Sequence, residues 1–196
     1  MERGFVKLER VDHSGRETIL DLVSPGAWLG SAAVIAELPS PASATTCTSA
    51  LIARVPARSF CERLVNDVDF SLSIHALNAQ EVCRHMAWIG QLASLTSVQR
   101  LRLVMRQMIT TLHLPPSDHG IRLRLPLHHW ELARLIAVTP EHLSRLLRNL
   151  QRDGVIQRDR GWVIVTDVQR LCPDSEWEDT QPVHYTPTFD VHQRRQ

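Results

Sequence analysis

The chain is short of lysine, of aromatic residues and of long apolar runs. Only Lys7 among its 22 basic residues is a lysine, and aromatic residues make up 5% of its 196 residues. No apolar run reaches the length of a membrane span and no signal peptide is evident, so no membrane association is expected. No Ser-His-Asp order, phosphate-binding glycine loop, paired-carboxylate motif or HExxH motif stands out, so no enzyme class is indicated.

The cysteines argue against two further classes of protein. Their spacing includes no close pair, so neither a zinc ribbon nor a dense disulfide framework is indicated. We expect a reduced, cytoplasmic protein in which the first three cysteines are small core residues. The four cysteines are Cys47, Cys61, Cys83 and Cys172.

The net charge of +1 conceals a gradient along the chain. Residues 97–152 contain nine arginines against three acidic residues, whereas the segment from Leu171 onward contains five acidic residues against Arg194 and Arg195. Positive charge gathered in one part of a chain favours a polyanionic partner. The distribution therefore predicts a nucleic-acid-binding element within residues 97–152.

Residues 140–152 predict a helix with two opposite stripes. Four leucines recur at the spacing of a buried helical face, and four charged side chains lie about 180° away. Arginine can bond bidentately to guanine, glutamate can accept from the cytosine amino group, and further arginines can hold phosphates. The stripes are Leu143, Leu146, Leu147 and Leu150 on one side, and Glu141, Arg145, Arg148 and Arg152 on the other.

The preceding residues complete a helix-turn-helix pattern. A short helix is expected over His129–Ala137, and the bend at 138–140 supplies Thr139 as N-cap and Pro140 at the first helical position. Ala137 stands where this turn often carries glycine for a positive φ, so slight strain is expected there. The pattern indicates DNA binding. A helical hairpin in another kind of core, with a solvated arginine face, is the alternative.

Two short apolar runs follow, Val155-Ile156 and Trp162–Val165. Gln157–Arg160 and Gly161 separate them, which predicts a small β-hairpin, and after a helix-turn-helix such a hairpin is typically a wing. Arg158 and Arg160 at its tip are placed to contact phosphate or the minor groove. An ordinary solvated hairpin explains these two arginines equally well.

The N-terminal part reads as β-structure followed by helices. The predicted strands are Gly4–Arg10, Glu17–Leu22, Ala44–Thr48 and Ala50–Val55, and the predicted helices are Ala57–Leu64, Asp69–Leu92 and Thr96–Leu112.

This order of elements resembles the cyclic-AMP receptor / fumarate-nitrate regulator (CRP/FNR) family of bacterial transcription factors. The most specific segments are Gly26–Gly30, Leu125–Leu127 and Thr139–Leu147, and the likeness extends to about Arg170. The resemblance implies an α+β fold with a partial β-roll (cupin/jelly-roll-like) sensor over 1–66 and a long dimerisation helix over 67–95. It also implies a winged helix-turn-helix domain over 96–171, followed by a tail over 172–196 that we expect to be disordered.

The resemblance implies a function as well. Members of the family read palindromic operators as homodimers, with two recognition helices one DNA turn apart. Here the base-reading positions correspond to Glu141, Ser144 and Arg145. Besides double-stranded DNA and a second copy of the chain, RNA polymerase is a candidate partner. The residues predicted to contact phosphate are His129, Thr139, His142, Arg148, Arg152, Arg158 and Arg160.

The effector region departs from the cyclic-nucleotide binders of the family. In those binders a glutamate follows the segment that matches Gly26–Gly30, called here the glycine corner, and a later Arg-Ser pair binds the phosphate. In this chain Gly30 is followed by Ser31, and residues 40–43 contain no arginine. His85 and Met86 stand where purine-contacting serine or threonine is expected. A cyclic phosphate would lack its guanidinium partner. We therefore predict an effector pocket at these four positions that does not bind cyclic AMP.

No cofactor and no metal are expected. The nearest approach to a ligand set is His75, Cys83 and His85 in the predicted long helix, and helical spacing puts Cys83 and His85 on different faces.

Family members also have several strands before the segment that matches 4–6, and iron–sulfur sensors carry their cysteine cluster there. Two explanations for the missing strands remain open: the sequence is truncated at its start, or the sensor domain is naturally smaller. The alternative function is a regulator remnant that acts through protein–protein interaction without DNA.

Overall fold

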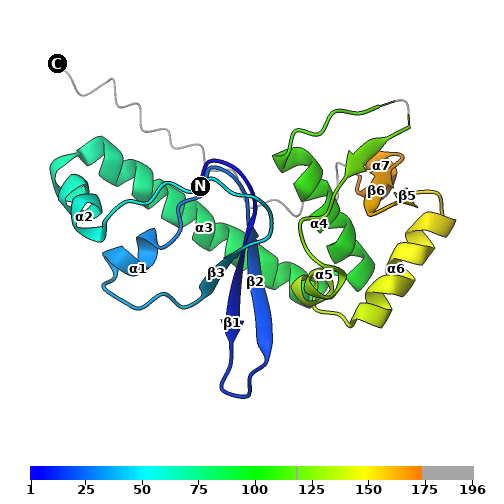
Figure 1. The fold of residues 1–196 in the computed structure, drawn as a ribbon, viewed down its shortest axis with the longest axis horizontal. Helices are drawn as coiled ribbons and strands as arrows, with labels where there is room; N and C mark the ends of the chain where they lie inside the picture. Colours follow the sequence, from blue (N-terminus) through cyan, green and yellow to red (C-terminus); the bar gives the residue numbers. More distant parts are fainter. Residues whose placement is uncertain (118, 174–196) are drawn as a thin grey trace.

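The computed structural model describes residues 1–117 and 119–173, which form an α+β fold (Figure 1). A small N-terminal sheet and two short helices lie along one long helix, and a second group of helices with its own sheet lies at that helix's far end. The strands are β1 Val6–Val11, β2 Glu17–Val23, β3 Ser43–Thr46, β4 Ile121–Leu123, β5 Ile156–Asp159 and β6 Trp162–Val165. The helices are α1 Ser31–Ile35, α2 Ala57–Asn66, α3 Val68–Ser94, α4 Ser97–Thr111, α5 His129–Leu135, α6 Pro140–Arg152 and α7 Val168–Leu171.

The N-terminal sheet has the order β2-β1-β3, with both neighbouring pairs antiparallel. The predicted hairpin is confirmed, and a bulge between Leu8 and Glu9 shifts its register. The predicted strand over Ala50–Val55 is wrong. Within the described residues only Leu51 of that segment forms a bridge, to Arg3, because no neighbouring strand continues the pairing. The short helix α1 was not predicted.

Three aromatic rings hold the glycine corner against the helices. The Trp28 centroid lies 5.9 Å from those of Phe60 in α2 and Phe70 in α3, and the two phenylalanine centroids are 5.8 Å apart. Such tilted and edge-on contacts are the favourable arrangement for aromatic pairs. The corner, α2 and the start of α3 therefore form one packed unit.

The two long helices have well-defined N-termini. At α3, which has 27 residues, the Asp67 carboxylate accepts from the Phe70 backbone N–H. At α4, Thr96 and Gln99 form a capping box. Each arrangement satisfies backbone donors that a helix start leaves unpaired. No described helix combines the length and the apolar character needed to cross a membrane.

The main hydrophobic core lies between α4, α5, α6 and the C-terminal sheet, whose order is β4-β6-β5. The four leucines predicted for the buried side of α6 are all buried, at 0–8% exposure. Hairpin β5–β6 confirms the predicted wing, while β4 was not predicted. Ala137 has a φ of 55°, the left-handed conformation expected at this turn.

Hairpin β1–β2 packs against α5 and so joins the two halves of the molecule. Lys7 Nζ donates to Glu131 Oε1 at 2.6 Å, and both side chains are nearly buried. The other carboxylate oxygen of Glu131 accepts from the His128 backbone N–H, at the start of α5. Arg134 pairs with Glu17 at 2.6 Å on the exposed side of this contact.

The cysteines differ from expectation. Cys61 and Cys83 are exposed and Cys47 is half-buried, whereas Cys172 is buried. The core assignment was therefore wrong for Cys61 and Cys83, because their positions on α2 and α3 face away from the body of the described structure.

Candidate nucleic-acid interface

Helix α6 has a charged side opposite its buried leucine face. This side, called here the ridge, consists of Glu141, Ser144, Arg145, Arg148 and Arg152. Thr139 Oγ1 accepts from the His142 backbone N–H at 3.2 Å, and Pro140 occupies the first turn, so the helix begins where the sequence predicts. Glu141, Arg145 and Arg148 are exposed, and Ser144 is half-buried. Because the leucines hold the opposite side in the core, the ridge keeps a fixed orientation toward solvent.

Two histidines contact the ridge. His129 Nε2, from the start of α5, lies 3.3 Å from Ser144 Oγ. His142 Nδ1 lies 3.1 Å from Arg145 Nη2, and His142 Nε2 lies 2.9 Å from Ser97 Oγ at the start of α4. Both ring nitrogens of His142 are therefore bonded to side chains of the protein, which its prediction as a phosphate contact did not anticipate.

Glu141 is the acidic member of the ridge. Hydrogen bonds from its own backbone N–H and from the Thr139 side chain, helped by nearby His129, hold its pKa below the ordinary value. An ionised carboxylate only accepts hydrogen bonds. Glu141 is thus suited to meet an amino group rather than a phosphate.

A basic groove runs beside the ridge. It has a volume of about 510 Å³ and lies between the start of α5, the end of α6 and the wing. Its exposed lining includes His129, Gln151, Arg158 and Arg160, together with one acidic residue, Asp159. The groove brings the predicted wing arginines to the same surface as the predicted α5 histidine.

The N-terminal and C-terminal halves each match a known family model. Residues 1–67 match the cyclic nucleotide-binding domain, and residues 91–173 match the Crp-like helix-turn-helix domain. The chain belongs to the CRP/FNR family. This CRP/FNR chain is a DNA-binding transcriptional regulator and not an enzyme.

One curated relative is similar in sequence, and two solved structures are similar in fold. A probable transcriptional activator from Rhizobium leguminosarum bv. viciae is 26% identical over 171 residues, which span 86% of this chain and 69% of that protein. A CRP-family regulator from Thermus thermophilus matches the fold with a TM-score of 0.73 at 22% identity, over 90% of this chain and 85% of the other. FixK2 from Bradyrhizobium japonicum matches with a TM-score of 0.67 at 22% identity, over 86% and 82%.

The four predicted effector residues are not brought to one pocket. Gly30 and Ser31 line a cavity of about 310 Å³ together with Arg54. The Ser31 hydroxyl donates to Asn78 of α3 at 2.8 Å. His85 instead faces Asp21, and Met86 is 66% exposed.

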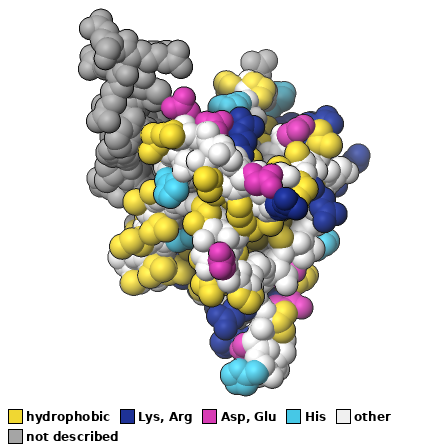
Figure 2. Space-filling model, turned by 90° about the vertical axis from the view of Figure 1, so that its left-hand side faces the viewer, with side chains coloured by type: hydrophobic (Ala, Val, Ile, Leu, Met, Phe, Trp, Pro, Cys, Tyr) yellow, Lys and Arg dark blue, Asp and Glu magenta, His cyan; other side chains and the backbone are white. Residues whose placement is uncertain are grey.

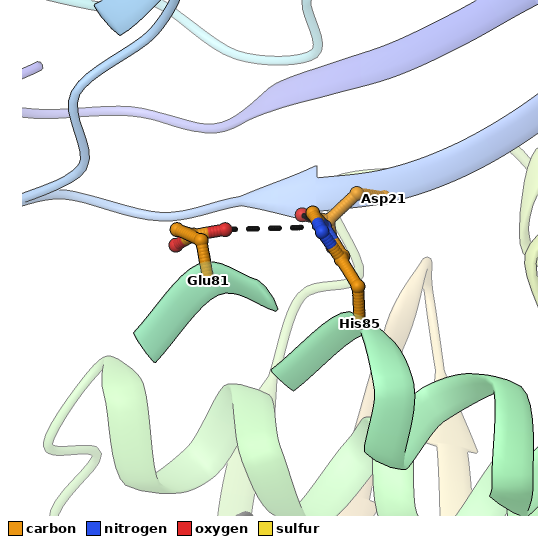
Figure 3. A group of neighbouring side chains, drawn as sticks. All are labelled: Asp21, Glu81 and His85. Carbon is orange, nitrogen blue, oxygen red and sulfur yellow. Dashed lines mark hydrogen bonds and ion pairs between the residues drawn. The ribbon is translucent and has the colours of Figure 1, made fainter. Parts of the chain in front are cut away.

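An ion-pair cluster joins the end of β2 to α3 (Figure 3). Ligand atoms of Asp21, Glu81 and His85 lie within 4.8 Å of one another, which is the spacing of a metal site. However, Arg84 Nη2 donates to Asp21 and to Glu81 and lies 3.2 Å from His85 Nε2. A guanidinium nitrogen thus takes the place that a cation would need, so the cluster does not favour a metal ion.

The buried carboxylate of this cluster is strongly perturbed. Burial alone would raise the pKa of Asp21, but hydrogen bonds with His85 and Arg84, and the charge of Arg84, lower it to about 2. At neutral pH Asp21 is therefore an ionised partner of Arg84. The sequence reasoning singled out His85 but missed Asp21, because the two lie 64 positions apart.

Proposed function

We propose that the chain reads a palindromic operator as a homodimer, with one α6 ridge in the major groove of each half-site. The observation that carries the proposal is the ridge itself. Its charged side chains project from a helix whose opposite face is locked into the core, and Glu141 and Arg145 remain exposed. This is the presentation that base reading by a helix-turn-helix requires.

Within this proposal some residues of the ridge contact DNA bases, and other residues on and around it contact phosphates. Glu141, Ser144 and Arg145 near the start of α6 read base edges, as the N-terminal residues of recognition helices do. Phosphate contacts come from the residues around them: His129, Thr139, Arg148, Arg152, Arg158 and Arg160. His142 is left out of the phosphate set because both of its ring nitrogens are already bonded.

The homodimer is supported by the outer face of α3. Eight exposed residues follow one another at intervals of three or four positions along this side of the helix, and all but one of their side chains are apolar. A repeat of this spacing is the pattern by which two helices pair in a coiled coil. The stripe, called here the α3 stripe, consists of Val68, Leu72, His75, Ala79, Val82, Met86, Ile89 and Ala93.

The other side of α3 is occupied within the chain. Ile74 is 2% exposed, Asn78 bonds to Ser31, and Arg84 bonds to Asp21. Figure 2 shows the molecule from the side on which α1, α2 and the start of α3 lie, and hydrophobic side chains are exposed on this side as well. Two copies joined along the α3 stripe remove apolar surface from water, which stabilises the pair.

We further propose that the sensor does not respond to cyclic AMP. Ser31 is turned toward Asn78, and His85 is held by Asp21, so neither is free to receive the nucleotide. Calorimetric titration of cyclic AMP into the full chain is expected to show no binding. Micromolar affinity would contradict this, and because Arg54 lines the cavity, Arg54→Ala would then show whether it supplies the phosphate partner.

A selection from random duplexes tests the main proposal. The full chain is expected to enrich an inverted repeat with half-site centres one helical turn apart, and binding should weaken steeply with salt. Enrichment of single half-sites would contradict the homodimer. Absence of any duplex binding at low salt would contradict DNA reading and favour the remnant that acts through protein partners.

A further inference from the structure

A chain of three side chains leads from the body of the domain to the ridge. Ser97 Oγ lies 2.9 Å from His142 Nε2, and His142 Nδ1 lies 3.1 Å from Arg145 Nη2. Ser97 is the first residue of α4, on a helix that has no part in the ridge. The imidazole thus bridges a rigid support and a flexible arginine.

The chemistry of the two ends determines which nitrogen carries the proton. A guanidinium has donors only, so Arg145 must donate and His142 Nδ1 must accept. A neutral imidazole with an unprotonated Nδ1 carries its proton on Nε2, which then donates to Ser97 Oγ. The direction of both hydrogen bonds is therefore defined.

Besides the two contacts of its ring, His142 is held through its backbone. The His142 backbone N–H donates to Thr139 Oγ1, the N-cap of the helix, and the side chain is half-buried. Arg145, in contrast, is exposed and has a long side chain whose ordering costs conformational entropy. A fixed acceptor beside it limits the directions in which the guanidinium can point before DNA arrives.

We propose that His142 is a positioning residue: supported by Ser97, its Nδ1 orients Arg145 for base reading. This inference rests on the proposed role of Arg145 and deepens it. It assigns His142 to sequence discrimination, whereas a phosphate contact would add affinity for every sequence alike.

Two amide variants of the full chain separate these roles. In His142→Asn the amide oxygen lies near the place of Nδ1 and can still accept from Arg145, whereas in His142→Gln the amide reaches toward Ser97. Discrimination is the ratio of affinities for the selected operator and for the same duplex changed at the Arg145 position. We expect roughly tenfold loss of discrimination for His142→Gln and loss within about threefold for His142→Asn.

Ser97→Ala changes a residue of α4 that lies outside the ridge and is not among the proposed DNA contacts. It removes the support of the ring, so discrimination is expected to fall while affinity for scrambled duplex stays the same. In the Arg145→Ala background, His142→Gln should change nothing further, as a double-mutant cycle would show. Melting temperatures confirm that every variant folds.

Several outcomes would overturn the inference. Equal weakening of cognate and scrambled binding by both amide variants would make His142 a phosphate contact, and no change in either would make it a bystander. Nitrogen NMR of the DNA-free chain gives a readout that does not depend on the role of Arg145. It should find the His142 proton on Nε2, and a proton on Nδ1 would exclude the bond from Arg145. If Arg145→Ala leaves discrimination intact, the base-reading proposal fails separately.

Discussion

At the scale of single residues, Arg145 carries the first prediction. Arg145→Ala should lose about 1–3 kcal/mol of binding free energy on the selected operator and relax base choice at one position per half-site. The matched control is Arg148→Ala, which should weaken all sequences alike and reduce the salt slope by about 1. Fluorescence anisotropy on cognate and scrambled duplexes at two salt concentrations measures both. Equal losses on the two duplexes for Arg145→Ala would remove it from base reading.

Asp21 gives a prediction about pH. Its pKa is about 2 in the folded chain against an ordinary value of 3.8, so its ionised form contributes to stability above pH 3.8. That contribution, roughly 2 kcal/mol, is lost as the pH falls from 3.8 toward 2. Urea unfolding should show that Asp21→Asn destabilises the chain less at pH 3 than at pH 5, by about 1 kcal/mol.

The control for this measurement is Glu81→Gln, the more exposed partner of Arg84. An exposed ion pair contributes little, so this variant should change stability by less than about 1 kcal/mol at either pH. If the effect of Asp21→Asn did not depend on pH, pairing with Arg84 would not lower the pKa of the Asp21 carboxylate.

At the scale of elements, the leucine face of α6 determines whether the ridge is presented at all. Leu143 is fully buried, so Leu143→Ala should lower the free energy of unfolding by about 2–5 kcal/mol through lost packing and the cavity left behind. Asn149→Ala, on an exposed position of the same helix, should cost less than about 1 kcal/mol. Chemical denaturation followed by circular dichroism compares the two variants. Similar losses would mean that the face is not packed.

The contact between hairpin β1–β2 and α5 gives a second prediction at this scale. Glu131→Gln keeps an acceptor for the His128 N–H but removes the charge that faces Lys7, so it should destabilise the chain by about 1–3 kcal/mol. Lys7 should also react faster with an amine-reactive reagent, which mass spectrometry can follow.

Glu17→Gln is its control. It breaks the more exposed pair with Arg134, and it should cost less than about 1 kcal/mol and leave the reactivity of Lys7 unchanged. If Lys7 in the unaltered chain reacts as fast as a free amine, the buried pair does not persist in solution.

The elements that the sequence predicted well are those defined by local signals. Helix α6 follows from its leucine spacing, from Thr139 as N-cap and from Pro140, and all of these act within a few residues. Strand β4 was missed because its three residues become a strand only by pairing with β6, which lies some forty positions later. The segment 50–55 has the composition of a strand, but it lacks a neighbour over most of its length.

In the candidate site, too, the features that follow from local sequence could be predicted and those that depend on distant residues could not. Glu141, Arg145 and Arg148 could be placed on one ridge because helix geometry alone decides which residues share a face. Ser97 could not be connected to His142, since 45 positions separate them and only the folded domain brings the starts of α4 and α6 together. The same holds for Lys7 and Glu131, which are 124 positions apart.

At the scale of the whole molecule, the α3 stripe predicts the assembly. Val82→Glu places a carboxylate at the centre of the stripe, and two like charges facing each other should drive the dimer toward monomers. Sedimentation velocity at micromolar concentration should detect this, and affinity for the inverted repeat should fall toward that for a single half-site.

Val65→Glu provides the matched control, because Val65 is 81% exposed on α2, outside the stripe. It should leave both the oligomeric state and operator binding unchanged. A Val82→Glu chain that remains dimeric would place the contact between copies elsewhere on the surface.

The single lysine has a consequence for how the DNA surface can be controlled in a cell. Its ammonium lies between Glu9 and Glu131, beside the Trp130 ring, and is nearly buried in the contact between β1 and α5. Every cation on the ridge of α6 and on the wing is an arginine or a histidine. Acetylation of lysine, a common way to remove positive charge from a regulator, therefore has no substrate on the face that we propose to meet the operator.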